Sequence, residues 1–273
     1  MNYVSLVGIA LLATTTLMAQ NFNGSDDFSD SGTSAGNWTA GAATGSGNPA
    51  FTVSEGSERL DFTSDAITGD ANGKLNWTWS VNTGSITEDW SVYVDFGFNA
   101  TVSAGQTIYW ALTASNSDHT NNHVYIAMQW NSASGGTPEG GAFSSTNGVE
   151  TAIGSGVNFG AATGTVGITF RSSEGLIVAG YDSDGAVGGY EFVEIGTFDA
   201  TGWGTSVGAT VLATLSAENW VQSGTGNAIT AGGAFADNFT AVPYDVSSVP
   251  EPETFAVGLG LISLGFVATR RRR

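Results

Sequence analysis

The sequence predicts an all-β protein built as a single two-sheet β-sandwich. Charged residues make up only 12% of the chain, and 39 glycines far outnumber 5 prolines, which disfavours long helices and collagen-like order. Apolar and polar residues alternate in many short segments, and stretches rich in Gly, Ser, Asn and Thr separate these segments. Short strands joined by turns are therefore the expected structure.

The alternation is clearest in residues 75–81 and 92–98, where every second side chain is apolar and each segment is predicted to be a strand with one buried face. Similar patterns predict strands at Glu58–Thr63, Thr107–Thr113, His123–Trp130, Thr165–Arg171, Leu176–Tyr181, Tyr190–Ile195, Thr210–Leu215 and Phe235–Val242. Residues 40–48 and 131–148 are rich in Gly, Ala, Thr and Ser and are predicted to be long surface loops. About ten to thirteen strands between residues 20 and 248 suit one sandwich domain.

The charge balance excludes several partners. The net charge is −18, from 25 acidic and 7 basic residues, and four of the basic residues are Arg270, Arg271, Arg272 and Arg273. Between the two ends, the basic residues are Arg59, Lys74 and Arg171. So few cations exclude nucleic acid and anionic membrane surfaces as partners. The chain has no Cys, which excludes disulfides, thiolate nucleophiles and cysteine metal sites.

The first 19 residues have the pattern of a signal peptide. An apolar run from Val4 to Leu12 precedes Ala19, the small residue that a signal peptidase needs just before its cut. The run is too short for a transmembrane anchor, which takes about 20 apolar residues. We expect residues 1–19 to be removed by signal peptidase during export.

Residues 249–273 form a second targeting segment with three parts. The motif Val249, Pro250, Glu251 and Pro252 precedes an uncharged apolar run, residues 255–269, and the four terminal arginines. As a helix this run would reach roughly 22 Å, short of the roughly 30 Å hydrocarbon core. We expect it to hold the chain in the inner membrane transiently, with the arginines on the cytoplasmic side.

This three-part segment closely resembles the PEP-CTERM sorting signal of Gram-negative, biofilm-forming bacteria. The residue after the second proline is Glu253, where that family usually has a small hydroxyl residue. The resemblance implies that a membrane-bound exosortase recognises Pro250, Glu251 and Pro252 and removes the helix. The protein would then pass from the inner membrane to the cell surface or the extracellular matrix.

The region between the two signals resembles the concanavalin A-like, laminin G-like jelly rolls of surface proteins. The residues that carry the resemblance are Asp26-Asp27-Phe28 with Trp38-Thr39, Arg59-Leu60-Asp61-Phe62, the Tyr181–Gly185 hairpin and Asp237-Asn238-Phe239. The resemblance implies this sandwich fold and leaves the function open, because lectins, enzymes and inert spacers share it.

Two groups of aspartates are candidate calcium ligands, since carboxylate oxygens suit this hard cation. One group lies near the start of the domain and the other in the Tyr181–Gly185 hairpin, where a simple Asp-Gly turn is the alternative interpretation. The pairing of terminal strands in jelly rolls would bring a further aspartate close. The candidates for a structural Ca²⁺ are Asp26, Asp27, Asp30, Asp182, Asp184 and Asp237. No other cofactor is required.

Aromatic side chains supply a candidate glycan-binding surface, because pyranose faces pack on aromatic rings. Most aromatic residues of the chain are expected in the core. Tyr93 and Tyr125 lie on the side opposite the apolar rows of their strands, which makes them the better candidates.

No catalytic residues are predicted. Glu191 and Glu194 stand three apart in a strand, so they would point to opposite faces and could not flank one glycosidic bond. The Gly32–Gly36 match to G-x-S-x-G has no strand–turn–helix context. His119 and His123 have a ligand-like spacing, but a turn-prone stretch separates them, which favours a surface loop leading into a strand.

We therefore expect an exported, non-catalytic structural or adhesion component of a biofilm or exopolysaccharide layer. One alternative is a lectin-like module for neutral or weakly acidic polysaccharide, which requires exposed aromatic residues on a concave sheet face. A second alternative is a polysaccharide hydrolase or lyase, which requires two carboxylates about 5–10 Å apart in a cleft.

Overall fold

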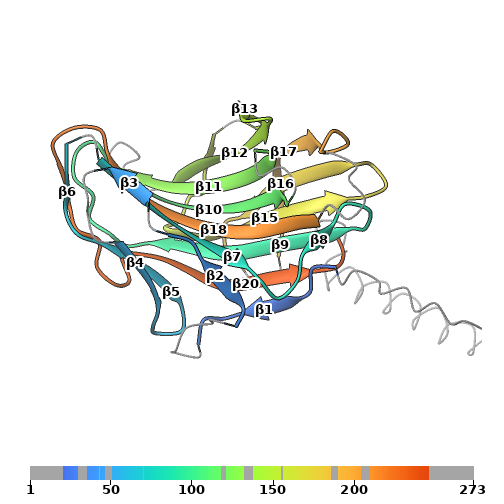
Figure 1. The fold of residues 1–273 in the computed structure, drawn as a ribbon. Helices are drawn as coiled ribbons and strands as arrows, with labels where there is room; N and C mark the ends of the chain where they lie inside the picture. The colour runs from blue at the N-terminus through green and yellow to red at the C-terminus, as the bar shows by residue number, and fades with distance from the viewer. Residues whose placement is uncertain are drawn as a thin grey trace, which may run out of the picture.

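This computed structural model describes residues 21–29, 36–42, 44–46, 51–69, 71–117, 121–131, 138–154, 156–185, 190–203 and 210–245. They form two large antiparallel sheets and a small two-stranded one. Within these residues the backbone forms strands and turns and no helix. The predicted all-β class and two-sheet sandwich are confirmed, and Figure 1 shows the two layers of strands.

The first sheet has eight strands in the order β17-β16-β15-β9-β20-β5-β4, with β1 paired to β20. Their bounds are β1 (Gly24–Asp26), β4 (Phe51–Glu55), β5 (Leu60–Ser64), β9 (Trp90–Phe98), β15 (Thr163–Arg171), β16 (Leu176–Asp182), β17 (Val193–Asp199) and β20 (Ala234–Val242). The first and last strands of the described chain, β1 and β20, therefore lie side by side.

The second sheet has ten strands in the order β13-β12-β11-β10-β18-β7-β2, with β14 paired to β12, β3 to β7 and β8 to β18. Their bounds are β2 (Trp38–Ala40), β3 (Thr44–Ser46), β7 (Ala71–Trp79), β8 (Gly84–Ser85), β10 (Gln106–Asn116), β11 (His123–Asn131), β12 (Glu139–Thr146), β13 (Val149–Ala152), β14 (Val157–Asn158) and β18 (Thr210–Val221). The short strands β6 (Ile67–Thr68) and β19 (Thr225–Gly226) pair with each other.

The core between the sheets is dominated by aromatic rings. The ring of Trp38 lies 4.7 Å from that of Phe239 and 5.1 Å from that of Trp79, both in edge-on arrangements that add to the free energy of burial. Asp26 closes this cluster, because one carboxylate oxygen accepts a hydrogen bond from Trp38 Nε1 (2.8 Å) and the other from the Phe28 amide (2.9 Å).

The predicted loop at residues 131–148 is wrong, since residues 139–146 form β12 in the interior of the ten-stranded sheet. Gly140 explains the error: a Cβ at this position would lie 1.9 Å from the carbonyl oxygen of Ala127 on β11, so glycine here is required by the pairing. Likewise, the predicted loop at residues 40–48 contains the edge strand β3.

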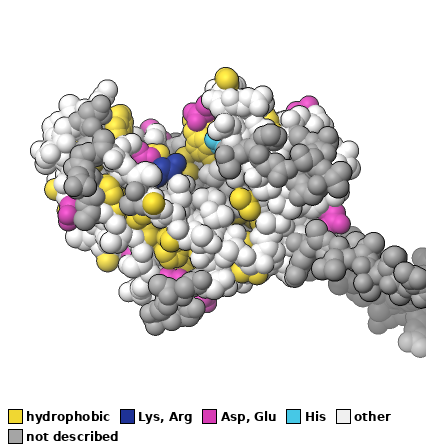
Figure 2. Space-filling view, viewed as in Figure 1, with side chains coloured by type: hydrophobic (Ala, Val, Ile, Leu, Met, Phe, Trp, Pro, Cys, Tyr) yellow, Lys and Arg dark blue, Asp and Glu magenta, His cyan; other side chains and the backbone are white. Residues whose placement is uncertain are grey.

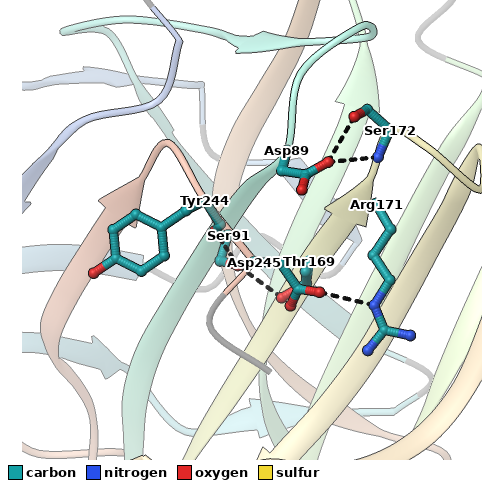
Figure 3. Close-up of polar contacts among 7 residues, drawn as sticks. All are labelled: Asp89, Ser91, Thr169, Arg171, Ser172, Tyr244 and Asp245. Carbon is teal, nitrogen blue, oxygen red and sulfur yellow. Dashed lines mark hydrogen bonds and ion pairs between the residues drawn. The ribbon is translucent and has the colours of Figure 1, made fainter. Parts of the chain in front are cut away.

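Figure 3 shows how the last described residues are held against the eight-stranded sheet. Arg171 Nε donates to Asp245 Oδ2 across 2.9 Å, and the Ser91 hydroxyl donates to the carbonyl oxygen of Tyr244, also across 2.9 Å. These contacts hold Tyr244 against the start of β9 and Asp245 against the end of β15. The targeting segments predicted at residues 1–19 and 249–273 lie outside the described residues, within which no helix long and apolar enough to span a membrane is found.

Candidate functional site

The outer face of the ten-stranded sheet is hollowed into a groove of about 550 Å³. Figure 2 shows this hollow in the upper part of the molecule, with hydrophobic, acidic, basic and histidine side chains around it. The lining residues are Lys74, Asn76, Tyr109, Ala111, Thr113, Ser115, His123, Tyr125, Ala127, Gln129, Phe143, Glu150, Thr214 and Ser216. A volume of this size suits a small ligand or a short stretch of polymer.

Small side chains form the floor of the groove. Strand register places four outward-facing residues of the groove in one row across β7, β18, β10 and β11. This floor row consists of Asn76, Ser216, Ala111 and Ala127. The Ser216 hydroxyl donates to Asn76 Oδ1 across 2.8 Å, and the two alanines carry no polar side-chain atom.

One wall of the groove is aromatic. Tyr125 and Phe143 are register partners on β11 and β12, and their rings stack with centroids 5.1 Å apart and planes 20° apart. The ring of His123 lies 5.9 Å from Tyr125. Burial raises the pKa of Tyr125, and the charge of Glu150 and a hydrogen bond to it raise that pKa further. The phenol therefore stays protonated near neutral pH.

The opposite wall is polar and centres on Tyr109. Register places Lys74, Glu218, Tyr109 and Gln129 in one row on β7, β18, β10 and β11. Tyr109 donates its phenolic proton to Glu218 Oε2, and Asn72 Nδ2 donates to Glu218 Oε1 across 3.3 Å. Burial raises the pKa of Tyr109, and the bond to Glu218 adds to this effect.

Several polar side chains in the groove have no hydrogen-bond partner in the described part of the chain. Among the residues that the structure describes, the side chains of Lys74, Thr113 and Gln129 line the groove and make no hydrogen bond or ion pair. By contrast, Arg59 and Arg171 are held by carboxylates at 3.0 and 2.9 Å. The groove thus presents free donors and acceptors beside an aromatic wall.

The two predicted glycan-binding tyrosines lie on different sheets. Tyr125 is in the groove, whereas Tyr93 is on the outer face of the eight-stranded sheet and only 7% exposed. The rings of Tyr190 and Phe192 cover it, with centroids 4.4 and 5.9 Å away. The expectation of an exposed Tyr93 was wrong, because the segment before β17 folds back over β9.

The five predicted calcium ligands that the structure describes do not converge on one point. Asp26 faces the core, as described above, and Asp30 lies outside the described residues. Asp27 and Asp184 are exposed, and Asp182 is buried with its oxygens accepting hydrogen bonds from the amides of Asp184 (3.2 Å) and Glu191 (2.8 Å). No group of three or more His, Asp or Glu side chains in the described ranges is placed to hold a metal ion.

Asp237 belongs instead to an acidic row on the outer face of the eight-stranded sheet. Register aligns Asp182, Thr165, Asp95 and Asp237 on β16, β15, β9 and β20. Thr165 donates to Asp95 Oδ1, and Asn238 Nδ2 donates to Asp95 Oδ2 across 2.9 Å. Burial raises the pKa of Asp237 to about 6, and the negative charges of Asp95 and Asp27 add to this shift.

The remaining candidates fall on both sides of the molecule. Glu191 precedes β17, and Glu194 lines a shallow hollow of about 160 Å³ on the eight-stranded sheet, away from the groove. His123 begins β11, as the strand interpretation expected, yet it lines the groove. His119, Ala19, the sorting motif and the terminal arginines lie outside the described residues, as do most of residues 32–36.

Fold and groove together define an all-β sandwich protein with an open groove on one outer face. No protein-family model and no curated protein matches the sequence. Solved structures with a similar fold include the potassium-bound carbohydrate recognition domain of Emp46p (11% identity, covering 78% of this chain and 91% of that one, TM-score 0.45). Others are the exoplasmic/lumenal domain of VIP36 in its Ca²⁺/Man3GlcNAc-bound form (10%, 85% and 93%, 0.49) and a Bacillus licheniformis beta-glucanase (14%, 82% and 97%, 0.47).

Proposed function

We propose that this protein binds carbohydrate in the groove of the ten-stranded sheet. The observation that carries the proposal is the stacked pair Tyr125 and Phe143 beside Gln129, Thr113 and Lys74, whose side chains have no partner among the described residues. An aromatic wall packs against the apolar C–H groups of a sugar ring, and unpaired donors and acceptors suit its hydroxyl groups.

We propose binding without catalysis. Both carboxylate oxygens of Glu218 already accept hydrogen bonds, from Tyr109 and Asn72, so this residue holds Tyr109 in place. The raised pKa values of Tyr109 and Tyr125 keep both phenols protonated, which makes them hydrogen-bond donors and poor bases. These features disfavour both a paired-carboxylate hydrolase and a lyase with a tyrosine base.

A glycan array combined with a reducing-sugar assay tests this function. The purified protein should bind neutral or weakly acidic glycans and release no reducing ends. Binding should fall in Tyr125→Ala and persist in Tyr244→Ala, a matched control because Tyr244 is exposed on the other side of the sandwich. Sugar release that Glu218→Gln or Glu150→Gln abolishes would contradict the proposal, and so would an array without any bound glycan.

We also propose that the protein is exported by way of residues 1–19 and sorted by an exosortase-type system by way of residues 249–273, to act at the cell surface or in the matrix. Substituting Pro250, Glu251 and Pro252 together should leave the protein in the inner membrane, and deleting residues 255–273 should release it as a secreted domain. Cell fractionation with intact-mass measurement checks both. A triple variant that reaches the surface with an unchanged mature mass would refute this route.

A further inference from the structure

We infer that the groove binds an internal stretch of a linear, neutral glycan whose ring hydroxyls are all equatorial. The chain would lie along the floor row, across the strands. This inference rests on the proposed function and names the class of carbohydrate that the groove accepts.

The direction of binding follows from the register. The floor row crosses four adjacent strands, and at a spacing of about 4.8 Å between strands it is roughly 14 Å long. The row containing Tyr125 and Phe143 borders it on one side, and the row containing Tyr109 and Gln129 borders it on the other. A trough of this length holds several consecutive sugar rings, so a longer chain gains contacts that a disaccharide cannot make.

The preference for equatorial ring hydroxyls in the glycan follows from the apolar side chains in the middle of the floor. Ala111 and Ala127, in the middle of the groove, supply no polar side-chain atom, and the backbone of their strands is paired within the sheet. The polar groups that are open to a ligand, such as those of Gln129 and Thr113, stand on the walls instead. A ring lying flat over Ala111 and Ala127 satisfies hydroxyls at its rim and leaves any hydroxyl directed at these two alanines without a partner.

An axial hydroxyl is therefore selected against. In a β-1,4-linked ribbon, successive rings present alternate faces, so an axial hydroxyl points at the floor on every second ring, and the ring over Ala111 and Ala127 finds no partner for it there. A buried, unpaired hydroxyl lowers affinity by about tenfold or more.

The charge of the groove selects neutral chains. Glu150 lines the groove and Glu218 stands in its polar wall, against the single cation Lys74 among the described lining residues. A polyanionic chain would also meet the overall charge of −18.

Calorimetric titration with matched oligosaccharides tests the inference. The β-1,4-linked gluco- and manno-hexasaccharides form similar ribbons and differ only in an equatorial or axial hydroxyl at carbon 2. The purified protein should bind the gluco-hexasaccharide about tenfold or more tightly than the manno-hexasaccharide, and more tightly than the gluco-disaccharide. Equal affinity for the two hexasaccharides, or for the two gluco chain lengths, would overturn the inference.

The variant Ala127→Ser tests whether the apolar floor causes the preference for the gluco-hexasaccharide. The serine hydroxyl gives an axial hydroxyl of the manno chain a hydrogen-bond partner, so the ratio of gluco to manno affinity should shrink severalfold. Tyr244→Ala should leave this ratio unchanged. Because Ala127 faces outward, the serine variant should fold, and its thermal midpoint verifies this. An unchanged ratio in folded Ala127→Ser would overturn the inference while leaving carbohydrate binding intact. Failure of the unmodified protein to bind either hexasaccharide would overturn the inference, whereas carbohydrate binding itself falls only if the glycan array shows no bound glycan.

Discussion

On the outer face of the ten-stranded sheet, polar side chains such as Gln129 and Thr113 have no partner among the described residues. On the outer face of the eight-stranded sheet, polar side chains bind one another: Ser91 lies 2.8 Å from Thr169, and Thr165 donates to Asp95. Both faces arise from the same alternation of inward and outward residues. The difference shows that the side-chain contacts within each face, rather than its composition, decide which face remains available to a ligand.

The aromatic residues of the two faces differ in the same way. The ring of Phe235 lies over Gly97, and the guanidinium of Arg59 lies 4.6 Å from the centre of that ring, so this part of the eight-stranded sheet is covered. Tyr125 and Phe143 stack on each other instead, beside a row of small residues. An aromatic ring above a glycine fills a sheet face, whereas small residues between larger side chains leave it hollow.

The largest effect on glycan affinity should come from a bulky side chain on the open face, the groove of the ten-stranded sheet. Ala127→Trp places an indole on the groove floor and should lower glycan affinity about a hundredfold, because the ring occupies the space of the ligand. The free energy of unfolding should change by less than about 1 kcal/mol, since the new side chain enters open space. Titration calorimetry and denaturant unfolding measure the two quantities, and full binding by this variant would place the ligand elsewhere.

A larger side chain on the covered face, the outer face of the eight-stranded sheet, should lower stability rather than glycan affinity. A Cβ at Gly97 would lie 2.2 Å from the ring of Phe235, so Gly97→Val should destabilise the fold by about 1–3 kcal/mol. Glycan affinity of the folded variant should be unchanged. Denaturant unfolding tests this, and a variant as stable as the natural chain would show that the face is not closely packed.

The sandwich itself could be predicted because alternation survives in most core strands. β12 was missed because Gly140 and Gly141 have the composition of a loop, and the close approach of Ala127 that requires a glycine is not visible in a local pattern. Tyr125 was found from its outward position. Tyr93 has the same local pattern, and its burial depends on Tyr190, which the chain brings back from nearly a hundred residues away.

The rest of the groove was beyond the sequence for a related reason. His123 and Gln129 lie on the predicted strand, but their shared role appears only when β10, β12 and β18 are aligned beside it. Glu150 comes from β13, a short exposed strand without an apolar row.

The acidic row of the covered face should make stability depend on pH. The pKa of Asp237 is raised from 3.8 to about 6, so its protonated form favours the folded state. The stabilisation is complete below about pH 3.8 and is lost as the pH rises through 6. After solvent screening is allowed for, this loss is about 1 kcal/mol. Asp237→Asn should match the natural chain at low pH and exceed it in stability above pH 6, whereas parallel curves would exclude this role.

Calcium should produce the smallest effect. Asp26 and Asp182, two of the six predicted ligands, already accept hydrogen bonds from protein N–H groups. Ca²⁺ and Mg²⁺ at matched ionic strength should therefore raise the melting temperature equally, by screening the negative charge. A further rise with Ca²⁺ alone would reveal a specific site and revise this account.

The central claim is that the ten-stranded sheet has an open outer face and the eight-stranded sheet a covered one. Truncating one tyrosine on each face tests this claim most directly. Titration of the gluco-hexasaccharide into folded Tyr125→Ala should show an affinity at least about tenfold below that of the natural chain, because the stacking wall is lost. Folded Tyr93→Ala should keep the natural affinity while unfolding at a lower temperature, because Tyr93 packs beneath Tyr190 and Phe192. Unchanged binding in Tyr125→Ala together with lost binding in Tyr93→Ala would contradict the account.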